Sequence, residues 1–107
     1  MDTLTYTFKI QGPAKSPAVI VAGGADSNRD GVISNADEVA ALQTTDSSTW
    51  TRTQNVAGAT SGMAFAVHFT VGVGVPWQLT IANAAGTTLF SAASTTIWAF
   101  DTVSYIL

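Results

Sequence analysis

The residues best suited to chemistry lie together in one acidic segment of the chain. They share oxygen-bearing side chains at short intervals, and they are Asp26, Asn28, Asp30, Ser34 and Asp37. Carboxylate, amide and hydroxyl oxygens are hard ligands, which Ca²⁺ binds in sets of six to eight. The segment therefore predicts a calcium site. The simpler alternative is a solvated turn rich in Asp, Asn and Gly that holds no metal.

The net charge of the chain is concentrated in the same segment. The 107 residues have a formal charge of −3, and the segment 26–38 supplies all of it, with four acidic residues against Arg29. The other charged side chains cancel one another. A body that is otherwise neutral argues against a nucleic-acid partner held through phosphate contacts.

Residues 26–37 follow the twelve-residue EF-hand calcium loop nearly position by position. Gly31 is at the sixth position, where the loop turns sharply. Val32 would offer its backbone carbonyl, and Asp37 would close the shell at the twelfth position with Glu38 beside it. A Ser-x-x-Asp capping pattern then favours a short helix over about residues 35–43.

The stretch 26–42 resembles the calcium loop and the helix start of a dockerin repeat. The resemblance covers about seventeen of the 107 residues. It implies metal ligation by Asp26, Asn28, Asp30, Val32, Ser34 and Asp37. A dockerin carries two such repeats and this chain has one, so the resemblance does not extend to a cohesin partner.

A single loop without a paired EF-hand favours a structural ion over a cytosolic sensor. Such a site would be saturated by extracellular calcium, so we expect a secreted or cell-surface protein. The first five residues have neither the basic nor the apolar region of a signal peptide. No run of apolar residues is long enough to span a bilayer.

Around the loop, apolar and polar residues alternate with a period of two, which is typical of strands. About seven strands are expected, at residues 3–10, 17–22, 48–56, 63–73, 77–81, 87–91 and 95–107. The last is apolar on both faces, which predicts a central strand or one covered by something else. We therefore expect one all-β domain over residues 1–107, an immunoglobulin-like sandwich of the early-set type.

The order of several features resembles the early-set immunoglobulin-like modules that bind starch or glycogen. The counterparts here are the segments 19–23, 50–53, 58–62 and 65–69 and the later Trp77. The resemblance implies a carbohydrate-binding module appended to a secreted enzyme as the alternative function. Trp77 and Trp50 would be its sugar-stacking rings, with Trp77 the more exposed, whereas Trp98 is expected in the core.

Catalysis is not expected. The chain has no cysteine and a single histidine, His68, and no Gly-x-Ser-x-Gly segment supports a nucleophilic serine. The residues instead predict a non-catalytic module with a structural, adhesive or self-assembling role. Its partners would be calcium and a protein or a second subunit bound through sheet edges, where the strand that reaches Leu107 could complete a neighbour.

Overall fold

The computed structural model describes residues 2–10, 20–31, 33, 38–45, 48–56, 60–70, 75–95 and 100–107. These residues form nine strands: β1 (Asp2–Ile10), β2 (Ile20–Ala25), β3 (Ala40–Ala41), β4 (Gln43–Thr44), β5 (Thr49–Val56), β6 (Ala64–Thr70), β7 (Pro76–Ala82), β8 (Thr88–Thr95) and β9 (Phe100–Ile106). Parts of three predicted strands, residues 17–19, 71–73 and 96–99, lie outside the described residues. The described part of the chain contains no helix that could cross a membrane.

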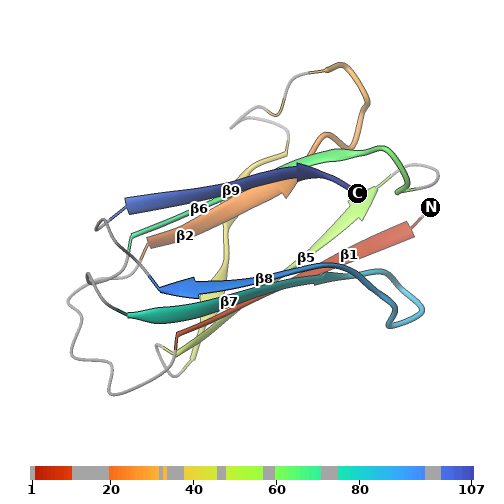
Figure 1. The fold of residues 1–107 in the computed structure, drawn as a ribbon. Coiled ribbons are helices and arrows are strands. Elements are labelled where there is room, and N and C mark those ends of the chain that lie inside the picture. The colour runs from red at the N-terminus through yellow and green to blue at the C-terminus, as the bar shows by residue number, and fades with distance from the viewer. Residues whose placement is uncertain are drawn as a thin grey trace.

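The strands form two antiparallel sheets that face each other as two layers (Figure 1). One sheet has the order β4-β5-β1-β7-β8, and the other has the order β3-β2-β6-β9. The predicted all-β class is thus confirmed. The first two strands of an immunoglobulin domain pair with each other, whereas β1 lies at the centre of one sheet and β2 in the other. The strand order therefore lends no support to the immunoglobulin-like type.

Alternation along the strands builds the core, as the sequence predicts. In β6 the side chains of Phe65, Val67 and Phe69 are buried, while the residues between them lie on the outer face. β1 buries its apolar residues in the same way, from Leu4 to Ile10. Because successive side chains of a strand point to opposite faces, each sheet contributes one apolar face to the space between the layers.

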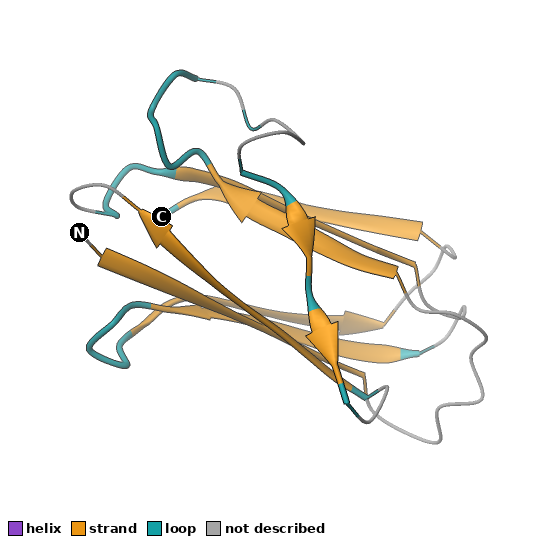
Figure 2. Ribbon diagram, turned by 180° about the vertical axis from the view of Figure 1, so that it is seen from behind, coloured by secondary structure: helices purple, strands orange, loops and turns teal. Residues whose placement is uncertain are grey.

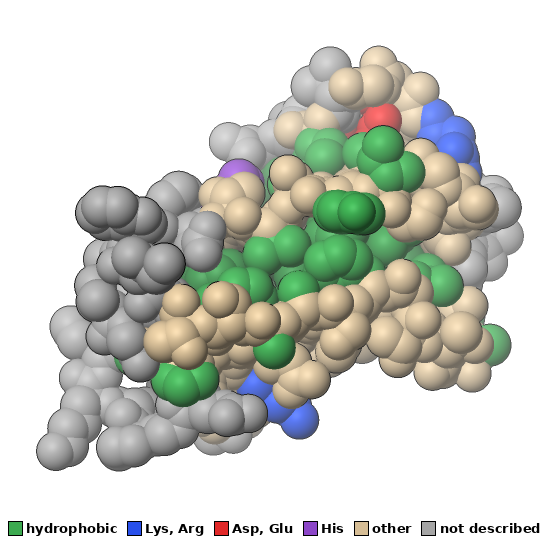
Figure 3. Space-filling view, viewed as in Figure 1, with side chains coloured by type: hydrophobic (Ala, Val, Ile, Leu, Met, Phe, Trp, Pro, Cys, Tyr) green, Lys and Arg blue, Asp and Glu red, His purple; other side chains and the backbone are tan. Residues whose placement is uncertain are grey.

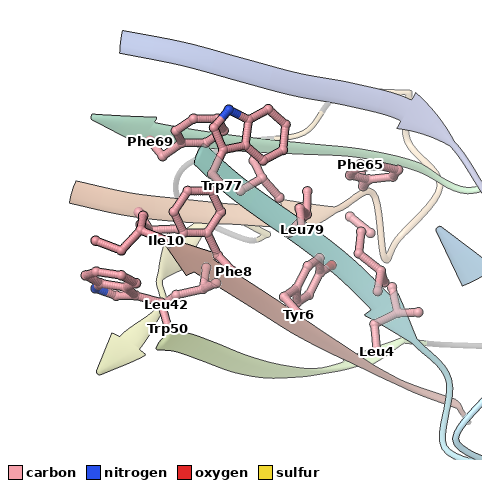
Figure 4. Packing of buried hydrophobic residues seen from close by; sticks show 14 of the residues in the cluster. Leu4, Tyr6, Phe8, Ile10, Leu42, Trp50, Phe65, Phe69, Trp77 and Leu79 are labelled. Carbon is pink, nitrogen blue, oxygen red and sulfur yellow. The ribbon is translucent and has the colours of Figure 1, made fainter. Parts of the chain in front are cut away.

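Aromatic rings fill one end of this core (Figure 4). The ring centroid of Phe8 lies 4.6 Å from that of Phe69 and 6.0 Å from those of Trp50 and Trp77. The rings come from both sheets, β1, β5 and β7 on one side and β6 on the other. Aromatic contacts of this kind stabilise the packing by about 0.5–1.5 kcal/mol each beyond the burial of area.

The segment 40–44 passes from one sheet to the other. Ala40–Ala41 pairs with β2 and Gln43–Thr44 pairs with β5, and Figure 2 shows the two short strands leading between the layers. Between them the buried Leu42 donates its N–H to the carbonyl of Val21 at 2.9 Å. The predicted helix over residues 35–43 is therefore wrong at residues 40–43, where pairing with both sheets outweighs weak helix propensity. Residues 34–37 lie outside the described residues.

Of the two places expected for the last strand, the centre of a sheet is wrong. β9 ends the four-stranded sheet beside β6 instead of lying at its centre. In the described part of the chain, no strand pairs with its other edge. Two of its apolar residues, Tyr105 and Ile106, which point to opposite faces of the strand, are exposed.

Candidate metal centre

The acidic loop begins where β2 leaves its sheet. The N–H of Asp26 donates to the carbonyl of Ala64 at 2.8 Å, which continues the pairing of β2 with β6 by one residue. Asp26 is buried as a result, although it carries a carboxylate. The first predicted ligand is therefore held by the rigid end of a sheet.

Hydrogen bonds to side-chain oxygens shape the turn that follows. The Asp26 carboxylate accepts the N–H of Asp30 at 3.2 Å and that of Gly31 at 2.9 Å. Asn28 Oδ1 accepts the Asp30 N–H as well, at 3.2 Å. Gly31 has a φ of 85°, a conformation that glycine adopts at little cost, so the sharp turn predicted there is confirmed. The oxygens of Asp26 and Asn28 therefore point to the inside of the loop.

Glu38 reaches the same place from the other end of the loop. Its backbone carbonyl lies directly against Gly24, where an added Cβ would be 1.9 Å from that oxygen. Arg52 Nη1, from β5, donates to the Glu38 carbonyl at 2.6 Å and also to the carbonyl of Gly23. A glycine in β2 and an arginine in β5 thus hold residue 38 against the start of the loop.

The carboxylates of Asp26, Asp30 and Glu38 converge in this arrangement. One oxygen from each lies within 4.8 Å of the other two. Ca²⁺ binds oxygens at 2.3–2.6 Å, so two ligands of one ion are at most about 5 Å apart. Asp26 and Glu38 are buried and Asp30 is exposed, so the cluster opens to solvent on one side. A bound cation would compensate the negative charge of two buried carboxylates so close together.

The structure brings together part of the predicted ligand set. Asp26 and Asp30 share the cluster, and Asn28 is tied to it through the N–H of Asp30. Val32, Ser34 and Asp37 lie outside the described residues. Glu38 is the acid that the EF-hand spacing leaves out, because it follows the twelfth position. Its acidic type was visible in the sequence, but its complete burial depends on contacts with β2 and β5.

Gln54 of β5 connects the two sheets just before the loop. Its Nε2 donates to the carbonyl of Ala25 at 3.1 Å, and its Oε1 accepts the Ala25 N–H at 3.0 Å. The hydroxyl of Tyr6 donates to the same Oε1. Burial raises the pKa of the Tyr6 phenol far above its ordinary value, so this donor stays protonated. The residue before Asp26 is therefore fixed by a buried side chain from the opposite sheet.

The tryptophans predicted to stack on sugars are in the core. Trp50 is 4% exposed and Trp77 is 5% exposed, and both pack on Phe8. The prediction that Trp77 is exposed is wrong, because its register opposite Ile10 directs the ring to the inner face of the sheet. Trp98 lies outside the described residues.

His68 lies on β6 away from the acidic loop. The alternation of β6 places it on the outer face, where Nδ1 is 3.1 Å from Thr102 Oγ1 of β9.

Comparison of the chain with protein-family models, with curated proteins and with solved structures gives no match. The loop and its three carboxylates are the features from which a function can be inferred.

Proposed function

We propose that the chain is a calcium-binding β-sandwich module of an extracellular protein, in which the ion stabilises the fold. The module has a structural, adhesive or self-assembling role and is not catalytic. The observation that carries the proposal is the convergence of Asp26, Asp30 and Glu38 within 4.8 Å, in a loop whose spacing follows the EF-hand scheme.

Charge and ligand chemistry support calcium in this place. The segment 26–38 holds the whole formal charge of −3, so a bound divalent cation would reduce the total to −1. The side-chain atoms that would bind the ion are all hard oxygens. One face of the cluster is open to solvent, which leaves room for the remaining ligands. Val32, Ser34 and Asp37 stay proposed ligands on the sequence pattern.

The position of the cluster explains how the ion would stabilise the fold. Asp26 is bonded to β6 through Ala64, and Glu38 is bonded to β5 through Arg52. An ion shared by these two acids would thus link the ends of the loop to both sheets. At a hundredfold excess over the dissociation constant, binding stabilises the folded state by about 2.7 kcal/mol.

Thermal unfolding with and without calcium tests the proposal. For a domain of this size 1 kcal/mol shifts the melting temperature by about 4–8 °C, so saturating calcium should raise it by about 10–20 °C over a chelated sample. Asp30→Asn should abolish most of this shift. Asp2→Asn changes charge and size equally on β1, outside the loop, and should keep it. A melting temperature that millimolar calcium leaves unchanged would refute the role.

The alternative, a carbohydrate-binding module, loses its stated site, because Trp50 and Trp77 are buried. The adhesive or self-assembling role has support from the surface. Only 10% of the residues are charged, and charged side chains are among the means by which sheets resist pairing with other sheets.

A further inference from the structure

The two ends of the acidic loop are held by neighbouring side chains of one strand. Gln54 of β5 makes two hydrogen bonds to the backbone of Ala25, directly before the loop. Arg52 of β5 donates to the carbonyl of Glu38, directly after the loop 26–37. Both side chains lie on the inner face of β5, and the two residues are about 7 Å apart along the strand, at 3.4 Å per residue. One strand of the opposite sheet therefore holds both ends of the loop.

Arg52 is held by contacts with three strands. Its Nη1 donates to the carbonyl of Gly23 in β2 as well as to that of Glu38. Its guanidinium lies over the ring of Tyr6 in β1, 5.9 Å from the centroid, as a cation–π contact. A Cβ added at Gly24 would lie 2.6 Å from Arg52 Nη1 and 1.9 Å from the Glu38 carbonyl oxygen. The absence of a side chain at residue 24 thus leaves the room in which Arg52 reaches Glu38.

We propose that Arg52 is a positioning residue of the calcium site, which sets the affinity for the ion through Glu38. The inference rests on the proposed calcium-binding function, and it names a residue that the loop pattern does not contain. Glu38 supplies one of the three convergent carboxylates, and Arg52 holds its backbone. A ligand that is already held in place loses less conformational freedom when it binds, which raises the affinity.

The charge of Arg52 separates positioning from a simple electrostatic effect. A guanidinium beside a ligand residue repels a cation, so charge alone predicts tighter calcium binding when a neutral residue replaces Arg52. Positioning predicts weaker binding, because Glu38 loses the group that holds its backbone. Arg29 provides a matched control, since it is an exposed arginine within the loop itself. Figure 3 shows acidic and basic side chains on the surface at the end of the molecule where the loop lies.

Calcium titrations of the folded variants test the proposal, at a temperature well below the melting temperature of each variant without calcium. Arg52→Gln should bind calcium about 10–100-fold more weakly than the wild type, the usual effect of replacing a group that orients a metal ligand. Arg29→Gln removes the same charge and should bind at least as tightly as the wild type. An Arg52→Gln variant that binds calcium as tightly as the wild type, or more tightly, would overturn the proposal.

Arg52→Lys separates the charge from the shape of the side chain. The lysine keeps the positive charge but lacks the planar guanidinium that contacts two carbonyls and the Tyr6 ring. Its calcium affinity should therefore lie between those of the wild type and Arg52→Gln. If Arg52→Gln does not fold, Arg52→Lys carries the test, and an affinity equal to that of the wild type refutes the proposal.

A double-mutant cycle tests whether Arg52 acts through Glu38. Terbium replaces calcium in this titration, because its higher charge strengthens binding to carboxylates and keeps the weak variants measurable. Arg52→Gln should weaken binding much less in the Glu38→Gln background than in the wild type, since the effects of interacting residues are not additive. In the Asp30→Asn background the full weakening should remain, because Arg52 holds Glu38. Equal weakening in the two backgrounds would contradict an action through Glu38.

A merely structural role of Arg52 predicts a different set of results. It would lower the free energy of unfolding without calcium and leave the calcium affinity of the folded chain unchanged. A loosened Glu38 should instead release calcium faster, which is measured by mixing the loaded protein with a fluorescent chelator in stopped flow. Release at the wild-type rate from both Arg52 variants would count against positioning.

The same titrations separate this proposal from the proposed function. A wild type that binds calcium no better than the Arg52 variants refutes the role of Arg52 alone, and the calcium site stands. A wild type that binds no calcium refutes the proposed function and the role of Arg52 with it.

Discussion

Replacement of Gln54 by methionine should destabilise the protein far more than the loss of one surface polar group. Gln54 is buried and connects the two sheets through Ala25, the residue that precedes the acidic loop. Methionine has nearly the same length and fills the space without a hydrogen-bonding group. The substitution therefore isolates the hydrogen bonds from the packing.

The magnitude follows from the groups that lose their partner. These are the Tyr6 hydroxyl and the N–H and C=O of Ala25. A buried polar group that loses its partner costs about 1–3 kcal/mol. The sum is at least about 3 kcal/mol, a large part of the 5–15 kcal/mol by which small domains are stable.

Urea unfolding in saturating calcium measures this loss. Asn55→Met provides the matched control, because Asn55 is the exposed neighbour of Gln54 on the same strand. Its free energy of unfolding should stay within about 0.5 kcal/mol of the wild type. If Gln54→Met lost less than about 1 kcal/mol, the connection between the sheets would not have the importance that we assign to it.

Two other predictions follow from buried contacts. Because burial raises the pKa of Tyr6, the stability that its neutral form contributes is complete below about pH 10 and falls above it, by up to about 1.4 kcal/mol per pH unit. In urea titrations at rising pH, the Tyr6→Phe variant should lose less stability than the wild type. An equal loss in the variant and the wild type would contradict the assignment. Gly24→Ala should cost at least about 2 kcal/mol and weaken calcium binding, because the new Cβ would lie 1.9 Å from the Glu38 carbonyl oxygen. Gly31→Ala is the control, because a Cβ added at Gly31 has no atom within 4 Å and the substitution should lower the free energy of unfolding by only about 1 kcal/mol, for its φ of 85°. Similar losses in the two glycine variants would count against the close contact at Gly24.

Local patterns were enough to predict the long strands and the turn of the loop. The alternation in β1 and β6 reflects burial on one face, and Gly31 occupies the position where the chain turns with positive φ. These features depend on a residue and its near neighbours. They are therefore readable without knowledge of the rest of the molecule.

Features that depend on distant contacts could not be read in this way. The segment 40–43 has helix-forming residues, but Leu42 is held by Val21 and by the core. The place of Trp77 directly after Pro76, at the start of the predicted strand 77–81, favours an exposed ring, yet pairing with Ile10 turns the ring inward. Glu38 joins the acidic cluster only because Gly24 leaves room for its backbone. Each of these depends on which strands become neighbours.

Isothermal titration with calcium tests the metal site most directly. We predict one ion bound per chain in the wild type, with binding lost in Asp26→Asn and strongly weakened in Glu38→Gln. Asp2→Asn should bind like the wild type. A wild type that binds no calcium at millimolar concentration, or Asp26→Asn and Glu38→Gln variants that bind it unchanged, would contradict the assignment of Asp26, Asp30 and Glu38 as the metal centre.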